Sequence, residues 1–199
     1  GLQSRFAARQ LLFAHAALTD LAARRLVHAE RIARWNGEPG MPLGDAAVDD
    51  TRVQIGPWRF VREDAGAADR YTSRIVADDD AGFGWTLGLA TTQPRLLQGQ
   101  AGFSRKGPLP TQASHYYTQP QLAVDGTLSL RGGTRTAVRG RAWLDHEWSD
   151  SLMPDDAVGW DWIGINLDDG AALTAFRLRD AAGRAIWAGG SHRTRDGAL

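Results

Sequence analysis

The sequence predicts an all-β protein built from antiparallel strands, and three observations indicate this fold class. Short segments alternate apolar and polar residues, which is typical of strands that bury one face. Turn dipeptides such as Asp169-Gly170 and Ala182-Gly183 separate many of these segments. Glycine is frequent, with 23 residues, as tight turns and barrel corners require. Together these features predict a sandwich or a barrel.

The predicted strands follow one another along most of the chain. They occupy residues 53–61, 70–77, 83–90, 121–130, 136–144, 158–167, 172–180 and 185–191. Asp125-Gly126 and Gly132-Gly133 predict two further hairpin turns. Two longer stretches, 36–50 and 99–113, contain several Gly and Pro residues. We expect both to be loops at the open end of a barrel, where they would control access.

The first 35 residues fit two different structures. Ala, Leu and Arg are abundant there, and propensity alone favours a helix. The segment also divides at Thr19-Asp20 into two pieces, 12–18 and 25–33, that can alternate as strands. Tertiary packing often overrides propensity. For this reason, and because of the family resemblance given below, we predict two strands.

Composition narrows the class of protein. A chain of 199 residues suits one domain with a substantial core. Lys plus Arg equals Asp plus Glu at 23 each, which disfavours a nucleic-acid partner. The absence of cysteine excludes disulfides and thiolate chemistry. No apolar run approaches the ~20 residues of a membrane-spanning helix. The start at Gly1 without methionine predicts a processed or shortened chain.

Residues 139–170 carry the strongest functional signal, because they combine tryptophans with acids and a histidine. The tryptophans, four of the eight in the chain, are Trp143, Trp148, Trp160 and Trp162, and the polar groups include Asp145, His146, Glu147, Asp150 and Asp161. Bulky aromatic rings are costly to leave in water and predict a shared wall or pocket. Titratable groups among them could take perturbed pKa values, as general acid–base chemistry requires.

Strand alternation divides this stretch into faces. His146 and Trp148 would share one face of a strand, and the acids at 145 and 147 would share the other. In the next strand, Trp160 and Trp162 would lie opposite Asp161. We predict His146 and Asp161 as candidate catalytic residues and the three tryptophans as ligand-binding residues. The alternative is that His146 and Asp161 are structural, because buried polar groups are normally satisfied by backbone or arginine.

Tyr116 and Tyr117 form a second aromatic cluster. Adjacent strand residues point to opposite faces, so at most one of the two side chains faces a cavity. We predict that this pair contributes to ligand binding. Packing in the core and on the surface is the alternative.

Metal and nucleotide sites are not predicted, and we expect no cofactor. Zinc needs three or four ligands, and neighbouring residues such as Asp145 and His146 point to opposite faces of a strand. Residues 102–107 lack both the Gly-Lys-Ser/Thr of a phosphate loop and the Gly-x-Ser-x-Gly of a nucleophile elbow. Ser104 and Lys106 are therefore expected in a loop, with contact to a ligand at a barrel mouth as the alternative.

Five segments, taken together and in order, resemble the AttH-type lipocalin-like branch of the carotenoid 1,2-hydratase (hydroxyneurosporene synthase, CrtC) family. They are RFAARQLLFAHAALTD (5–20), FSRKGP (103–108), HYYTQPQLAVDGTL (115–128), GRAWLDHEWSD (140–150) and GWDWIGINLDDG (159–170). The resemblance covers nearly the whole chain. It implies that the opening segments are strands, which is why we predict strands where propensity favours helix.

The resemblance implies two consecutive lipocalin-like antiparallel β-barrels in an exported bacterial protein of the periplasm or cell envelope, often encoded near ABC-transporter components. Residues 1–191 would then be most of the first barrel without its opening strands. Residues 192–199 would begin the linker to a second barrel. A barrel without some of its strands exposes edges. We expect the second barrel, or another chain, to cover them.

The hydratase branch of the family implies a His-x-Trp pair, which His146 and Trp148 match. It also implies a Tyr and an Asp, which would fall near Ala175 and Arg177, where neither is present. The implied chemistry protonates an isolated alkene to a tertiary cation and then adds water. An acid donor and aromatic faces would carry that step.

Three functions follow from the residues and the resemblance. The leading hypothesis is an exported protein that binds a small hydrophobic molecule or lipid and has ABC-transporter components as partners. The second is a hydro-lyase, a hydratase or cyclase acting on a polyene or terpenoid C=C bond. The third is a structural partner of a transporter with a packed interior. A tryptophan-lined cavity of roughly 300 Å³ or more would favour the first two. A carboxyl group facing that cavity would keep the second open.

Overall fold

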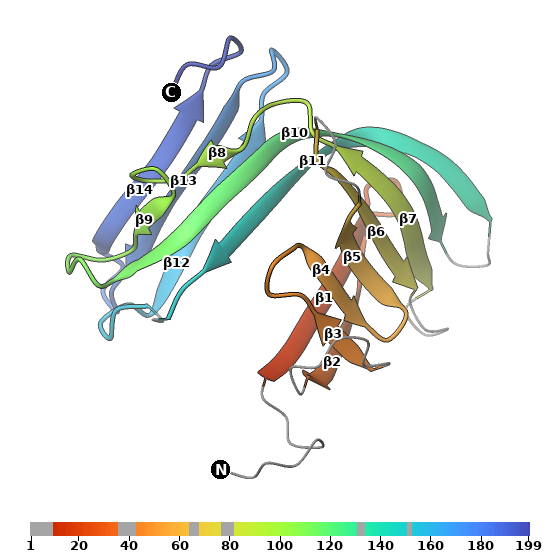
Figure 1. Ribbon diagram of the computed structural model, residues 1–199, viewed down its shortest axis with the longest axis horizontal. Coiled ribbons are helices and arrows are strands. Elements are labelled where there is room, and N and C mark those ends of the chain that lie inside the picture. Colours follow the sequence, from red (N-terminus) through yellow and green to blue (C-terminus); the bar gives the residue numbers. More distant parts are fainter. Residues whose placement is uncertain (1–9, 36–42, 64–67, 77–81, 131–133, 151–152) are drawn as a thin grey trace. The chain divides into compact units, whose positions relative to one another are not determined.

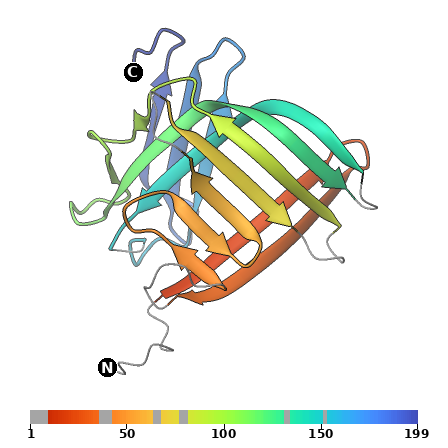
Figure 2. The same ribbon diagram turned by 45° about the vertical axis from the view of Figure 1, so that its right-hand side comes forward.

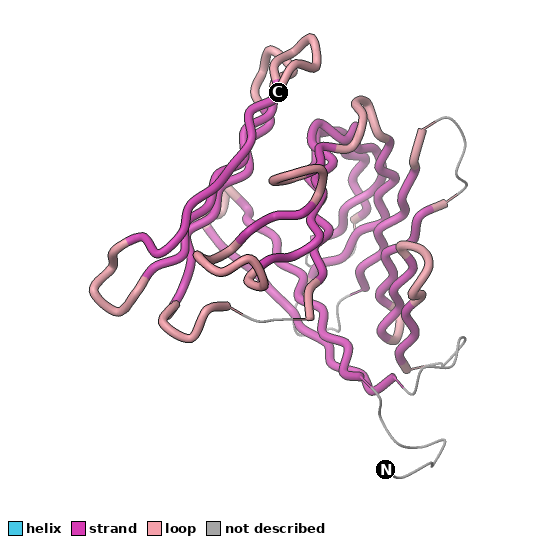
Figure 3. The backbone as a smooth tube through the Cα atoms, turned by 60° about the vertical axis from the view of Figure 1, so that its left-hand side comes forward, coloured by secondary structure: helices cyan, strands magenta, loops and turns pink. Residues whose placement is uncertain are grey.

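The computed structural model describes residues 10–35, 43–63, 68–76, 82–130, 134–150 and 153–199. Every regular element in this part of the chain is a strand (Figure 3), so the predicted all-β class is confirmed. Among the described residues, no helix is long and apolar enough to cross a membrane. The chain divides into two compact units, residues 1–90 with 124–140 and residues 91–123 with 141–199.

Unit 1 contains the hairpin of β1 (Gln10–Asp20) and β2 (Arg25–Trp35), whose antiparallel register runs without a break (Figure 2, red). These are the two strands predicted in the helix-prone opening segment. Their residues alternate in burial, and Ala16 packs with Trp58 and Phe83 in a small core. Packing of that alternating face stabilises the extended conformation over the intrinsic helix preference.

The sheet beside this hairpin is built from consecutive antiparallel strands. They are β3 (Gly44–Ala46), β4 (Arg52–Ile55), β5 (Trp58–Arg62), β6 (Arg70–Val76) and β7 (Phe83–Ala90), and β7 is followed in the sheet by β10 (Ala113–Leu130) and β11 (Arg135–Trp148). The strand order is β11-β10-β7-β6-β5-β4-β3, so the described sheet is open at both ends. It matches the expected partial barrel.

Three details of unit 1 differ from the prediction. Residues 36–50 are not all loop, because β3 lies within them, although 36–42 lie outside the described residues. Residues 53–61 form two strands, because Gly56 turns the chain with a positive φ of 56°. Asp125-Gly126 is not a turn but lies inside β10. A Cβ on Gly126 would lie 2.2 Å from the Thr86 carbonyl oxygen, so this glycine allows close approach of two strands. The predicted turn at Gly132-Gly133 lies outside the described residues.

Unit 2 contains a three-stranded antiparallel sheet in the order β12 (Gly159–Asn166), β13 (Ala172–Arg179) and β14 (Ala185–Arg193) (Figure 1). The turns predicted at Asp169-Gly170 and Ala182-Gly183 are confirmed, and they join these strands. In the same unit, β8 (Leu96–Leu97) and β9 (Phe103–Arg105) pair with the first half of β10. The predicted 99–113 loop therefore contains a short strand. Ser104 lies in this strand opposite Ser114 of β10 and not in a loop, whereas Lys106 follows the strand as predicted. The last strand, β14, ends at Arg193. The predicted domain division at 191 and the second barrel stay predictions.

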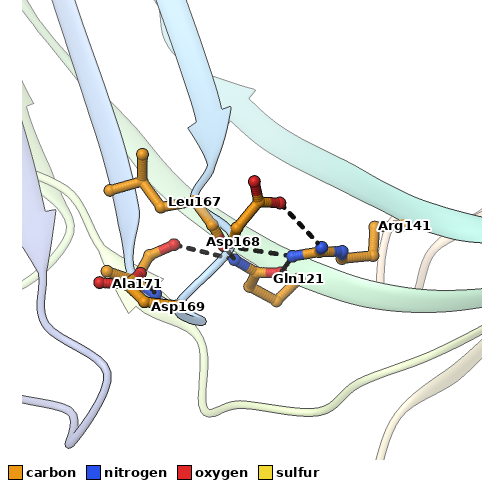
Figure 4. A network of polar contacts seen from close by, with 6 residues as sticks. All are labelled: Gln121, Arg141, Leu167, Asp168, Asp169 and Ala171. Atoms are coloured by element: carbon orange, nitrogen blue, oxygen red, sulfur yellow. Dashed lines mark hydrogen bonds and ion pairs between the residues drawn. The ribbon is translucent and has the colours of Figure 1, made fainter.

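Gln121 connects β10 to the β12–β13 turn (Figure 4). Its side-chain amide donates to the carbonyls of Leu167 and Ala171 at 2.9 and 2.8 Å. Its side-chain oxygen accepts a hydrogen bond from Arg141 at 3.1 Å, and Arg141 also pairs with Asp168. Gln121 is buried and has a positive φ of 56°. This network fixes one end of the three-stranded sheet against β10.

Candidate functional site

Unit 2 contains a cavity of about 340 Å³ that is open to solvent. It lies between one face of the three-stranded sheet and strands β9 to β11. Its walls combine aromatic side chains with two acids and a lysine. The lining residues are Ser104, Lys106, Ser114, Tyr116, Asp145, Glu147, Met153, Trp160, Trp162, Phe176 and Leu178. The volume lies in the range of small-molecule sites.

Strand alternation assembles the apolar wall. The register pairs Trp160 with Leu178 and Trp162 with Phe176, so all four side chains point to the same face of the sheet. Gly164 follows on that face, where a Cβ would lie 2.5 Å from the Trp162 ring. The absence of a side chain at Gly164 therefore leaves the space that the indole occupies.

Tyr116 supplies a buried hydroxyl next to this wall. The hydroxyl accepts a hydrogen bond from the Trp162 indole N–H at 3.3 Å. Burial raises the pKa of Tyr116 to about 12, and the charge of Asp145 adds to the increase. The hydroxyl is protonated at neutral pH, and Trp162, Thr118 and Asp145 share its hydrogen bonds.

Asp145 is held by a chain of hydrogen bonds. Thr118 and Trp143 donate to one carboxylate oxygen, Oδ1, at 2.7 and 2.9 Å. Thr118 in turn accepts a bond at 2.9 Å from Gln98, a buried side chain that also accepts from Ser191. Such a network fixes the orientation of the carboxyl group.

Glu147 is the second carboxyl group of the cavity. Ser114 donates a short hydrogen bond to Glu147, and the Lys106 ammonium lies 3.8 Å from the same oxygen. Alternation along β11 explains why both acids face the cavity, since they are two residues apart. The cavity thus presents two carboxyl groups and a phenol to any molecule inside it.

His146 and Trp148 lie on the opposite face of β11 and do not line the cavity. His146 shares a hydrogen bond of 3.0 Å with the Tyr117 hydroxyl, and its ring lies 5.2 Å from that of Trp148. His115 stacks on Trp148 with 5.3 Å between ring centroids. Burial and the nearby Arg95 charge lower the pKa of His146. We call these four side chains, His115, Tyr117, His146 and Trp148, the His146 cluster. The functional roles predicted for Tyr117, His146 and Trp148 stay predictions.

Asp161 lies on the outer face of the three-stranded sheet. Its carboxylate forms ion pairs with Arg177 at 2.6 Å and Arg179 at 3.0 Å. The hydrogen bond from Arg177 is the main reason that the pKa of Asp161 is lowered. The carboxylate is therefore ionised at neutral pH and outside the cavity. Its predicted catalytic role also stays a prediction.

The structure separates the predicted site residues into three places. Trp160, Trp162 and Tyr116 meet in the cavity, while the His146 cluster and Asp161 lie elsewhere. Sequence reasoning did not assign Phe176, Leu178, Ser114 and Met153 to the site. Alternation within 172–180 offered a signal for the first two, but only the pairing with β12 shows which face is inward. Within the described residues, no group of three or more acidic or histidine side chains could hold a metal ion.

The open antiparallel sheets and the aromatic cavity define a lipocalin-like β-protein. The chain belongs to the AttH-like family, whose model matches residues 1–199. It is similar to the crystal structure of an AttH from Nitrosomonas europaea, with a TM-score of 0.87 and 44% identity over 98% of this chain and 57% of that one.

A second similar structure is kievitone hydratase from Nectria haematococca. The TM-score is 0.66 and the identity 14%, over 94% of this chain and 53% of that one, so this likeness shows the fold alone. The chain spans little more than half the length of either structure. A comparison with curated proteins found no match.

Proposed function

We propose that the unit 2 cavity binds a small hydrophobic molecule that carries a hydrogen-bond acceptor. The observation that carries this proposal is the wall of Trp160, Trp162, Phe176 and Leu178 beside the buried Tyr116 hydroxyl. Apolar sites with a few placed polar groups are typical of small-molecule binding. In such a complex the rings would supply contact area, and the phenol would orient the polar group of the ligand.

The test is binding of the apolar fluorophore N-phenyl-1-naphthylamine, followed by energy transfer from tryptophan. Trp162→Ala should weaken binding roughly tenfold or more, because a ring at the centre of the wall is lost. Trp148→Ala is the matched control, since that tryptophan lies on the other face of β11 and should leave the affinity unchanged. Equal losses from both substitutions would contradict the proposal.

A second candidate function is hydration of an isolated C=C bond, favoured by the presence of Asp145 and Glu147 in the cavity. A protonated carboxyl group would transfer its proton to one alkene carbon, leaving a carbocation that the tryptophan faces stabilise. Water would then add to the cation and lose a proton to a carboxylate. The shared fold with a structure named as a hydratase supports this candidate, as does the resemblance to the carotenoid 1,2-hydratase family.

This candidate is tested by incubating the full-length protein with geranylgeraniol in heavy-oxygen water and analysing the product by mass spectrometry. Hydration should add one labelled oxygen per molecule. Asp145→Asn or Glu147→Gln should abolish the incorporation, whereas Asp161→Asn should retain it. Incorporation that survives in both cavity variants would contradict these roles.

We also propose that the protein works in the bacterial cell envelope, with a second barrel in the same chain and ABC-transporter components as partners. The family resemblance supports this proposal. Fractionation of cells that express the full-length gene, followed by affinity purification from the envelope fraction, tests it. Recovery in the cytoplasm alone, without transporter subunits, would argue against it.

A further inference from the structure

Unit 2 contains a second cavity of about 310 Å³ next to the first. It lies between β9 and β14, where Phe103, Arg105 and Trp187 form its sides. Gly189 and Gly190 provide a floor without side chains. Both strands belong to unit 2, which also contains the first cavity, so the two cavities lie within one compact unit.

The two cavities share Ser104 and Phe176, which line both. The register places Gly189 opposite Phe176, and a Cβ at Gly189 would lie 3.0 Å from the Phe176 ring. Because position 189 has no side chain, the ring rests over the glycine instead of being pushed toward the first cavity. A single elongated molecule could therefore pass the Phe176 ring and occupy both spaces.

Arg105 gives the second cavity a cation that is not paired with a carboxylate of the described residues, unlike the lysine of the first cavity. Its guanidinium lies 4.5 Å from the centre of the Trp187 ring. It donates to the carbonyls of Gly107 and Pro108, while its buried Nε has no hydrogen-bond partner. Among the described residues, no carboxylate pairs with it. Lys106, the cation of the first cavity, lies instead beside Glu147.

We propose that the second cavity binds the carboxylate end of an amphiphile whose apolar chain extends past Phe176 into the tryptophan-walled cavity. This inference rests on the proposed hydrophobic binding function and names the ligand class. A carboxylate at the Arg105 guanidinium would receive a charge-assisted hydrogen bond and balance a cation that has no carboxylate partner among the described residues. The opposing explanation is that Arg105 only braces the loop at 107–108, in which case ligand charge has no effect.

The test compares dodecanoate with dodecanol, two chains of equal length that differ in the end group. Isothermal titration calorimetry on the full chain should show at least a tenfold preference for dodecanoate, since a hydrogen bond to a charged group commonly contributes that much. Arg105→Gln should remove the preference, because dodecanoate should then bind no more tightly than dodecanol does to the same variant. Arg184→Gln, at an exposed arginine paired with Asp180, is the matched control and should keep the preference.

Bromine quenching of tryptophan fluorescence then tests the orientation in the unsubstituted protein and in Trp187→Phe. Dodecanoate brominated at carbon 2 should quench Trp187, so the substitution should remove much of that quenching. Dodecanoate brominated at carbon 12 should quench equally in both proteins. This readout does not depend on the folding of an Arg105 variant.

The outcomes separate this inference from the function on which it rests. If neither dodecanoate nor dodecanol binds, the hydrophobic binding function itself fails. If both bind with equal affinity, the cavity function stands and the carboxylate site is wrong. Quenching by the 2-bromo compound that is unchanged in Trp187→Phe would likewise overturn the orientation.

Discussion

Replacement of Gln121 by alanine should destabilise unit 2 by about 1.5–4.5 kcal/mol. The side chain makes three hydrogen bonds, to Leu167, Ala171 and Arg141. A neutral hydrogen bond contributes ~0.5–1.5 kcal/mol when its partner keeps another hydrogen bond. The bond from the charged Arg141 is counted at the same level, because this side chain is half-exposed and keeps its bonds to Leu167 and Asp168. Both carbonyls retain a backbone donor, from the amides of Gly170 and Leu167, which keeps the loss near this bond sum.

The backbone of Gln121 makes the prediction sharper. Its positive φ costs an ordinary residue roughly 1–2 kcal/mol, and glycine avoids this cost. Gln121→Gly should therefore be more stable than Gln121→Ala, although glycine inside a strand is normally the worse of the two. Urea denaturation followed by tryptophan fluorescence measures both values, because five of the eight tryptophans lie in unit 2.

Asp168→Asn is the control, since it removes an exposed ion pair with Arg141 and leaves the buried bonds in place. Its urea midpoint should be unchanged. The reasoning is refuted if Gln121→Ala unfolds at the same urea concentration as Asp168→Asn, or if the alanine variant is more stable than the glycine variant.

Three other predictions concern the cavity and the cluster behind it. Tyr116 should ionise near pH 12, so Tyr116→Phe should remove a step near that pH from the phenolate absorbance titration. Because the folded pKa lies above the ordinary value of 10, its contribution to folding stability is complete below pH 10 and is lost as pH rises toward 12. An unchanged titration above pH 11 in Tyr116→Phe would contradict this. Gly164→Ala should cost about 1–3 kcal/mol by forcing the Trp162 ring to move, whereas Gly140→Ala, with no atom within 4 Å of the added carbon, should be neutral or stabilising. Equal stability of the two alanine variants would show that the ring is not held against Gly164. The lowered pKa of His146 predicts that folding stability is full above pH 6.5 and declines at lower pH. His146→Gln should reduce this decline in urea midpoint between pH 7.5 and 5, and an identical decline in both proteins would exclude His146 as its source.

Local pattern predicted the fold class because alternation and turn residues depend on nearby positions. It also predicted that Asp145 and Glu147 lie opposite His146. Pattern could not show which face of β11 meets the sheet of β12–β14, since that depends on pairing between residues far apart in the chain. The cavity consequently contains the two acids rather than His146. Asp125-Gly126 misled for a similar reason: the glycine meets the backbone at Thr86, a contact that no local window contains.

The helix-prone opening segment illustrates the opposite case. Its residues favour a helix individually, yet Ala16 becomes buried against Trp58 and Phe83 when the segment is a hairpin. The sequence showed that the two pieces could alternate as strands, but it did not show which residues they would pack against. In the folded chain, burial in the core outweighs the helix propensity of these residues. The family resemblance was the reason to predict strands before the packing was known.

Native mass spectrometry of the full-length protein, purified gently from its own host, tests the central claim most directly. The account predicts a small-molecule adduct on the unsubstituted protein and on Trp148→Ala. The adduct should be lost when Trp160 and Trp162 are both replaced by alanine. An adduct that persists in the double variant, or none on the unsubstituted protein while added apolar ligands also fail to bind, would contradict a ligand site in the unit 2 cavity.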